Sequence, residues 1–157
     1  MILTLKQILK NYITRTRNMA VNVFLDANIL LDYSLKREHY SEAEEVMDLV
    51  ANKKVSAYIT ASVLHITGHW ISKAYGNINT KKLLISFLAD ISIIDIPHEI
   101  ALIALHSKID DIEDALQYYT AIHHKLDYFI SRDKKLQKDS ISILPVYTPK
   151  EFIAQLY

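Results

Sequence analysis

The chain of 157 residues contains no cysteine and only two glycines. Without cysteine it can form no disulfide, no thiolate zinc site and no cysteine nucleophile, and this composition suits the reducing cytoplasm, which is the location that we predict. Two isolated glycines cannot build a phosphate-binding loop of the Walker or Rossmann kind, because such loops need several glycines within a few residues. The absences therefore exclude thiol chemistry and the glycine-loop nucleotide-binding folds.

Long apolar runs are also missing. None reaches the roughly 18 residues that a membrane-spanning helix needs, and the stretch LLISFLADISIIDI is interrupted by Asp90 and Asp95. Half of the residues are nevertheless hydrophobic, which allows a single domain of this length to bury a sizeable core. We expect one domain without a membrane partner.

Charge is balanced overall but unevenly distributed. The chain has 18 basic and 18 acidic residues; four of the basic ones and none of the acidic ones lie in residues 1–18, so 14 and 18 remain, a net charge of −4. A mildly acidic body is not typical of a protein that binds DNA tightly and non-specifically. It suits an enzyme whose carboxylates hold cations.

The basic segment 1–18 is predicted to be an N-terminal extension outside the domain, which then spans residues 19–157. The segment is acid-poor and loosely amphipathic, as a targeting peptide is, but it lacks the apolar centre of a secretory signal. The other interpretation is that the natural protein begins at Met19.

From residue 20 onward, short β-branched runs alternate with longer helical patterns. Strands are predicted at residues 21–25, 55–60, 92–96, 127–131 and 143–146. Strands separated by helices need crossover connections, which produce a parallel sheet covered on both faces. The sequence therefore predicts an α/β fold, a single-domain three-layer α/β/α sandwich with a central, mainly parallel five-stranded sheet.

The helices carry recognisable boundaries. A helix over residues 61–75 should stop at Gly76, and Asn79 is a candidate cap for the next one. Thr148 and Glu151 have the spacing of a capping box around Pro149, which predicts a C-terminal helix.

Two acids follow predicted strands directly. Asp26 ends the first strand in VFLDANILLD, and Asp133 follows the fourth strand in FISRDKK. In parallel sheets, ligands bind beyond the carboxyl ends of the strands. Either acid could instead cap the helix that follows it, so neither acid alone indicates a ligand-binding site.

A third acid, Asp114, lies in DIEDALQYYTA, with Asp111 one turn earlier on the same side of the helix. The predicted inward positions of that helix are Ile112, Ala115, Leu116, Tyr119 and Ile122. Asp114 borders this stripe, although acids in a first turn often serve only the helix dipole.

Three carboxylates at one sheet edge would repel one another unless a cation neutralises them. Oxygen ligands without cysteine suit Mg²⁺ or Mn²⁺. The usual work of such sites is phosphoryl chemistry, in which the metal activates water and screens the leaving oxygen. Asn28 and Ser131 are neutral polar residues that could orient ligands or a scissile phosphate.

The three motifs, in this order and spacing, resemble the PIN domain, a nuclease family that includes the VapC-like toxins. The resemblance runs from about residue 20 to residue 157. It implies a metal-dependent ribonuclease whose catalytic and metal-binding acids fall on Asp26, Asp114 and Asp133, with Asn28 and Ser131 as supporting polar residues. It also implies a homodimer and an antitoxin protein as partner.

The sequence departs from the family at one position. The family usually has a further acid on the helix after the second strand, but no Asp or Glu occurs between Asp48 and Asp90. His65 and His69 occupy that helix at a spacing of four residues, either as metal ligands or as packing and hydrogen-bonding residues. The absence of the family's further acid implies weak catalysis.

The leading hypothesis is a Mg²⁺- or Mn²⁺-dependent endoribonuclease, and the resemblance to VapC-like proteins suggests the toxin of a toxin–antitoxin pair. Four basic residues close in sequence to the acids could contact the RNA backbone: Lys36, Arg37, Lys134 and Lys135.

Two alternatives remain open. The chain could be a weak or inactive module that binds RNA or a protein, which the missing acid favours. It could also be an aspartate-phosphorylated domain with Asp26 as nucleophile, but such domains pair a second acid closely with the first, and here Asn28 stands at that position.

Overall fold

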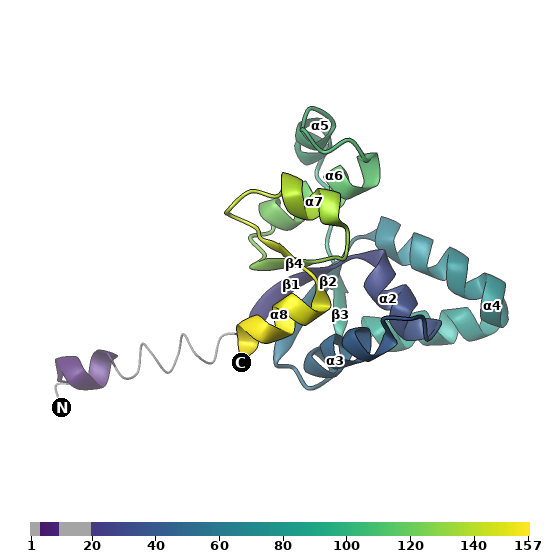
Figure 1. The fold of residues 1–157 in the computed structure, drawn as a ribbon, viewed down its shortest axis with the longest axis horizontal. Coiled ribbons are helices and arrows are strands. Elements are labelled where there is room, and N and C mark those ends of the chain that lie inside the picture. The colour runs from purple at the N-terminus through teal and green to yellow at the C-terminus, as the bar shows by residue number, and fades with distance from the viewer. Residues whose placement is uncertain (1–3, 10–19) are drawn as a thin grey trace.

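A computed structural model describes residues 4–9 and 20–157 of the chain. Residues 5–9 are helical, and the body of the protein follows from residue 20 (Figure 1). The elements of the body are β1 (Val21–Leu25), α2 (Ala27–Ser34), α3 (Tyr40–Ala51), β2 (Val55–Ile59), α4 (Ala61–Leu88), β3 (Ile91–Ile93), α5 (His98–Leu105), α6 (Ile112–His123), β4 (Tyr128–Ile130), α7 (Lys134–Asp139), β5 (Val146–Tyr147) and α8 (Pro149–Leu156).

The five strands form one sheet in the order β3-β2-β1-β4-β5, and every neighbouring pair is parallel. Helices α2, α3 and α4 gather on one side of the sheet, and α5, α6 and α7 gather on the other (Figure 1). The predicted fold class, an α/β sandwich around a five-stranded parallel sheet, is confirmed. The parallel arrangement brings the carboxyl ends of β1 and β4 together, since Leu25 is paired with Ile130.

The central strand β1 lies in the middle of the core. Val23, Phe24 and Leu25 are completely buried, and the ring of Phe24 stacks on that of Phe129 with centroids 4.8 Å apart. A strand covered on both faces reads as a continuous apolar run, which is why this element was predicted with its observed bounds.

The edge strands are shorter than the sequence pattern indicates. β5 covers only Val146–Tyr147, whereas the prediction began at Ile143, which is 68% exposed. Leu144, one of the two residues between Ile143 and Val146, is buried, and its carbonyl accepts a hydrogen bond from Tyr118 instead of from a strand. Ile143 therefore belongs to the loop before β5, because the carbonyl of the next residue bonds to a helix side chain and not to a neighbouring strand.

Helix α4 contains the break that was predicted at Gly76. This glycine has φ 76° and ψ 164°, which are not helical, and the helix resumes immediately after it. Asn79 is not a cap but lies within the second segment, where its side-chain amide donates to the carbonyl of Tyr75. The capping box of Thr148 and Glu151 at the start of α8 is present as predicted.

Helix α6 packs most of its predicted inward face against the core, because Ala115 is buried and Leu116, Tyr119 and Ile122 are partly buried against it. The prediction was wrong at the start of the helix and incomplete on its flank. Ile112 is 63% exposed, whereas Gln117 and Tyr118 are buried. The polar groups of both buried residues are paired, because Tyr118 donates to Leu144 and Gln117 bonds to Thr60. These long-range partners allow two residues with polar groups to be buried beside the apolar stripe of the helix.

The predicted boundary between residues 18 and 19 lies outside the described residues. Within the described part of the chain, no helix has the length and apolar character needed to cross a membrane.

Candidate functional site

Asp26 stands where β1 ends and α2 begins. Its backbone N–H donates to the carbonyl of Ile130 at 3.1 Å, which continues the ladder between β1 and β4 by one residue. Its side chain makes no capping bond to α2; Oδ2 accepts a hydrogen bond from the hydroxyl of Ser131 at 2.7 Å. Burial raises the pKa of Asp26 above its ordinary value, and the Ser131 hydrogen bond opposes that rise. Helix capping therefore does not explain this carboxylate.

Asp133 is tied to the same serine. Its backbone N–H donates to Ser131 Oγ at 3.1 Å, and its Oδ1 accepts from the backbone N–H groups of Lys135 and Leu136 at 2.9 and 3.0 Å. Asp133 is thus the N-cap of α7, which was the alternative to ligand binding that the sequence left open for this residue. Ser131 is 1% exposed and connects two of the three predicted acids, which gives this supporting residue a definite structural role.

Asp111 and Asp114 occupy the start of α6. Asp111 caps the helix by accepting from the backbone N–H of Asp114 at 2.9 Å. Asp111, Asp114 and Asp133 line one small cavity of about 110 Å³, together with Asp110 and Lys135 among others. The fold therefore brings acids from α6 and from the start of α7 to a common recess.

The electrostatics of Asp114 link all three predicted acids. Burial, followed by the nearby charges of Asp111, Asp26 and Asp133, raises the pKa of Asp114 to about 7. Such a shift means that ionising Asp114 is costly while its neighbours carry negative charge. A cation bound among these oxygens would remove that cost.

Glu113 also belongs to this group, although the sequence analysis did not single it out. Burial, then the charges of Asp26 and Asp111, raise the pKa of its carboxyl group. The sequence signal was its position next to Asp114 in the first turn of α6.

A buried ion pair lies behind the acids. Arg132, between Ser131 and Asp133, donates through its guanidinium to Asp32 on the last turn of α2. The Asp32 side chain is 2% exposed. The pair connects two segments that are 100 residues apart and anchors the Ser131–Asp133 segment against α2. No local sequence pattern predicts this ion pair.

Gln117 joins α6 to the start of α4. Its Oε1 accepts from Thr60 Oγ1 at 2.5 Å, and its Nε2 donates to Ser62 Oγ at 2.5 Å. Thr60 is at the same time the N-cap of α4. The helix that carries Asp114 is therefore held against the helix on which the family's further acid would be expected.

The remaining predicted residues are spread over the molecule. Asn28 is exposed near the start of α2, two residues after Asp26. Lys134 and Lys135 begin α7 beside the acids, and the ammonium group of Lys135 is 2.5 Å from Asp110 Oδ2. Lys36 and Arg37 lie beyond the far end of α2, roughly 15 Å along the chain axis from Asp26 at the helical rise per residue.

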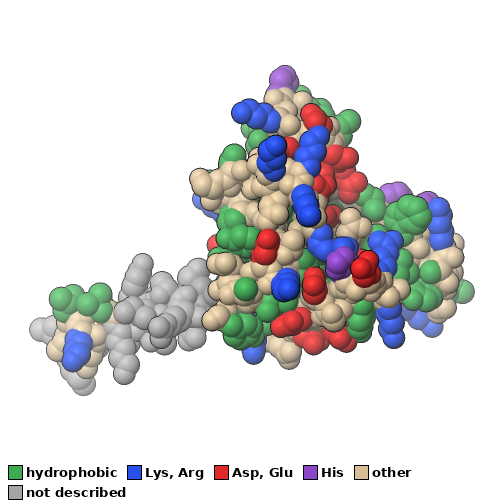
Figure 2. Space-filling model, in the orientation of Figure 1, with side chains coloured by type: hydrophobic (Ala, Val, Ile, Leu, Met, Phe, Trp, Pro, Cys, Tyr) green, Lys and Arg blue, Asp and Glu red, His purple; other side chains and the backbone are tan. Residues whose placement is uncertain are grey.

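His65 does not line the recess of Asp114 and Asp133. It lies with His69 in a separate cavity between the two segments of α4. Figure 2 shows acidic side chains gathered beside α6 and histidine side chains along the neighbouring stretch of α4.

The donor chemistry of the recess suits a hard divalent cation, because all its charged acceptors are carboxylates. Burial, and then the repulsion between these carboxylates, raises the pKa of Asp114. Over residues 4–9 and 20–157, however, no three Asp, Glu or His side chains are already arranged as ligands of a single ion.

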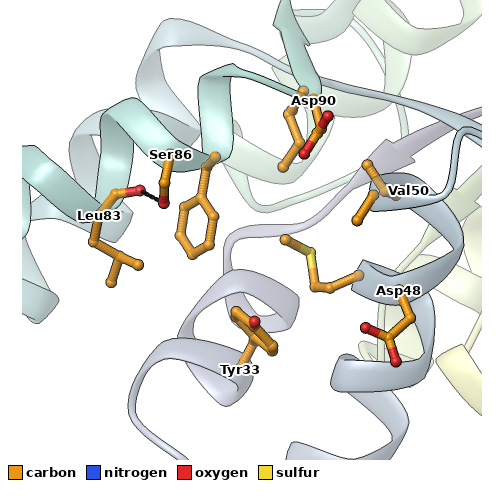
Figure 3. Close-up of a pocket in the computed structure, with 10 residues that line it drawn as sticks. Tyr33, Asp48, Val50, Leu83, Ser86 and Asp90 are labelled. Atoms are coloured by element: carbon orange, nitrogen blue, oxygen red, sulfur yellow. Dashed lines mark hydrogen bonds between the residues drawn. The ribbon is translucent and has the colours of Figure 1, made fainter.

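A second cavity, of about 170 Å³, lies among α2, α3 and the second segment of α4 (Figure 3). Its two acids, Asp48 and Asp90, come from different elements, and Ser86 donates to the carbonyl of Leu83 within the helix at 2.6 Å. It therefore offers no cluster of reactive groups comparable to the acidic recess.

A sequence model described as the PIN domain matches residues 22–135. No curated protein matches the chain.

Solved structures of the same fold include toxin–antitoxin proteins. VapBC2 from Rickettsia felis, bound to a promoter DNA fragment, is 19% identical with a TM-score of 0.64, covering 82% of this chain and 98% of that one. A toxin–antitoxin complex from Klebsiella pneumoniae is 23% identical, with a TM-score of 0.61 and coverages of 81% and 97%. VapC20 of Mycobacterium tuberculosis, a toxin that cleaves the sarcin-ricin loop, is 12% identical, with a TM-score of 0.61 and coverages of 77% and 97%.

Proposed function

This chain belongs to the PIN domain family, and from that premise we propose that it is a metal-dependent endoribonuclease that hydrolyses RNA phosphodiester bonds. The observation that carries the proposal is geometric: Asp114 and Asp133 line one recess, and Ser131 ties Asp133 to Asp26. Burial and the surrounding carboxylates also raise the pKa of Asp114 to about 7. Perturbed carboxyl groups gathered at the carboxyl edge of a parallel sheet are typical of a catalytic site.

Each acid has a role in this proposal. Asp26, Asp114 and Asp133 would hold Mg²⁺ or Mn²⁺, with Asp111 and Glu113 adding negative charge nearby. When bound, the metal lowers the pKa of an attacking water and screens charge on the leaving oxygen. Ser131 keeps Asp26 and Asp133 in place through its two hydrogen bonds.

The protein's own cations would position the substrate. Lys134 and Lys135 adjoin the acids at the start of α7 and are exposed, so they can contact phosphate oxygens beside the scissile bond. Asn28 would contribute hydrogen bonds at the same edge, while Lys36 and Arg37 would meet the RNA farther along α2.

We also propose that the protein acts as the toxin of a toxin–antitoxin pair, with an antitoxin protein as partner and a homodimer as the working form. The support is that two of the similar structures are described as toxin–antitoxin assemblies. Cleavage should be slow, because α4 supplies no acid to the site.

A second candidate is a binding module that holds RNA or a protein without cleaving it. The observation that favours it is that no three potential ligands are pre-arranged around one metal position among the described residues.

The decisive experiment incubates a mixed RNA pool with the full chain in Mg²⁺, in Mn²⁺ and in a chelator. Asp26→Asn keeps the shape and the Ser131 hydrogen bond but removes a charge, so cleavage should fall by at least about 100-fold, as when an essential charged group of a catalytic site is lost. The control is Asp95→Asn, which neutralises an exposed acid outside the recess and should cleave like the wild type. RNA binding without metal-dependent cleavage by the wild type would favour the binding module.

A further inference from the structure

Helix α4 is a hairpin of two helical segments, residues 61–75 and 77–88, that fold back on each other (Figure 1). Between them lies a cavity of about 460 Å³, more than four times the volume of the acidic recess. It is lined by Leu64, His65, Gly68, His69, Ser72, Asn77, Thr80, Lys81 and Leu84. The volume falls within the roughly 300–1,000 Å³ of typical small-ligand sites.

The only two glycines of the chain shape this cavity. Gly76 turns the chain between the segments with φ 76° and ψ 164°, a conformation essentially restricted to glycine. Gly68 lies where the segments come close, since a Cβ atom there would be 3.1 Å from Leu84 Cδ1. The turn and the close approach are thus both built into the sequence.

The charge of the hairpin is of one sign. No acid occurs between Asp48 and Asp90, while α4 carries three lysines and two histidines. Lys81, His65 and His69 line the cavity, and no described acid is within ion-pair distance of Lys81. An acid-free, lysine-bearing surface in a protein whose body is otherwise acidic favours an anionic ligand.

One end of the cavity, at His65, is connected to the acidic recess through a single side-chain hydrogen bond. Gln117 bonds to Ser62 at the start of α4, and His65 follows Ser62 by one helical turn. On the other side of this junction, Asp114 precedes Gln117 by one turn of α6. Two turns of about 5.4 Å, joined by one hydrogen bond, separate the cavity from Asp114 by a distance that one or two nucleotides can span.

We propose that the α4 cavity binds a nucleotide of the RNA strand next to the one that is cut. Lys81 and the two histidines face a backbone phosphate, the amide of Asn77 and the hydroxyl of Ser72 meet polar edges of the base or sugar, and Leu64 and Leu84 contact the apolar face of the base. The inference rests on the proposed ribonuclease function but assigns a separate subsite on a different helix.

Binding is tested with a fluorescent single-stranded RNA of about ten nucleotides and full-length protein that carries Asp26→Asn to prevent cleavage. Lys81→Ala should weaken binding by about 5- to 10-fold and reduce the dependence of log affinity on log salt by roughly 0.7, the value for one lost single-strand phosphate contact. Lys82→Ala is the matched control, because Lys82 is an exposed neighbour that does not line the cavity. It should change the affinity by less than about twofold, as a rim charge does.

A second pair of variants tests shape rather than charge. Ser72→Leu fills the cavity without altering charge and should weaken RNA binding several-fold, whereas Ala74→Leu, on the exposed side of the same helix, should not. Melting temperatures of all variants verify that each is folded. In the background with Asp26 intact, Lys81→Ala should raise KM and leave kcat unchanged.

The outcomes separate the two proposals. If the wild type cleaves RNA but neither Lys81→Ala nor Ser72→Leu alters binding or KM, the subsite is wrong and the ribonuclease proposal stands. If the wild type binds RNA through Lys81 without cleaving it, the subsite stands and the ribonuclease proposal fails. If a hexaglutamate peptide binds as tightly as RNA and with the same sensitivity to Lys81→Ala, the cavity is a site for an acidic protein segment and the inference is overturned.

Discussion

The acidic recess and the α4 hairpin are neighbours with opposite construction. The recess is crowded with carboxylates and is held by side-chain hydrogen bonds and one buried ion pair around Ser131 and Arg132. The hairpin has no acid and is shaped by two glycines, one of them in a conformation restricted to glycine. The stability contributed by the recess should therefore depend on pH, metal and charge substitutions, whereas the stability contributed by the hairpin should depend on backbone substitutions.

The ion pair behind the recess should give the largest change in stability. Arg132→Leu leaves the carboxylate of Asp32 buried without its partner, which should lower the free energy of unfolding by about 3–5 kcal/mol. Urea unfolding with a structural probe such as circular dichroism measures the change.

The matched control is the exposed pair of Lys135 and Asp110, whose side chains are 66% and 78% exposed. Lys135→Ala should leave stability unchanged, because solvent screens exposed pairs. Equal losses for Arg132→Leu and Lys135→Ala would show that burial does not distinguish the two pairs. Adding Asp32→Leu to Arg132→Leu should recover part of the loss, because it removes the unpaired charge.

The turn of the hairpin should give the next largest effect. Gly76→Ala places a Cβ atom in open space, with nothing within 4 Å, but forces alanine to adopt φ 76°. The expected loss is about 1–3 kcal/mol in the free energy of unfolding, all of it from backbone strain. A loss that varied with pH between 5.5 and 7.5 would contradict this separation of backbone from charge effects.

Metal and pH should change the stability of the protein through the carboxylates of the recess. The pKa of Asp114 is about 7 in the folded protein and 3.8 in the reference state, so the folded state binds the extra proton between these values. The stability of the metal-free protein should therefore fall as pH rises toward 7 and level off above it. Melting temperatures in a chelator at pH values of about 5.5 and 7.5 measure this difference, and Asp114→Asn should reduce it.

Divalent metal should reverse that trend. Because carboxylate ligands must be deprotonated, Mg²⁺ or Mn²⁺ should raise the melting temperature more at the higher pH than at the lower one. Asp26→Asn should weaken the response to metal and leave the metal-free protein as stable as the wild type or slightly more so. An identical response in both proteins would contradict a cation site that includes Asp26.

The smallest effect is expected for Gly68→Ala. The new Cβ atom would be 3.1 Å from the end of the Leu84 side chain, which can rotate slightly, and alanine stabilises a helix relative to glycine by roughly 0.5–1 kcal/mol. The net change in the free energy of unfolding should stay below about 1 kcal/mol, because the two terms oppose each other. A loss as large as that of Gly76→Ala would show that the two segments cannot shift relative to each other.

The sequence alone was sufficient wherever the determining interactions are local. The bounds of β1, the break at Gly76 and the capping box at Thr148 all follow from neighbouring residues, through apolar runs, backbone freedom and side-chain hydrogen bonds to the adjacent turn. The placement of Asp26 and Asp133 at one edge also followed, because parallel strands align their carboxyl ends once the order of elements is known.

Only the tertiary structure decided which distant groups meet. Gln117 was expected to lie outside the apolar stripe of α6 but is buried against Thr60, and Arg132 gave no local sign of its partner 100 residues earlier. Lys36 and Arg37 were grouped with the acids by sequence distance, yet they lie beyond the far end of α2. His65 was considered because it lies on the helix where the family's further acid is expected, yet it lines a separate cavity of α4. The spacing of apolar residues and the capping residues determine where each helix begins and how long it is. Which of its side chains are buried, and against which other elements, depends on hydrogen bonds and charges that are satisfied only when separate elements pack together.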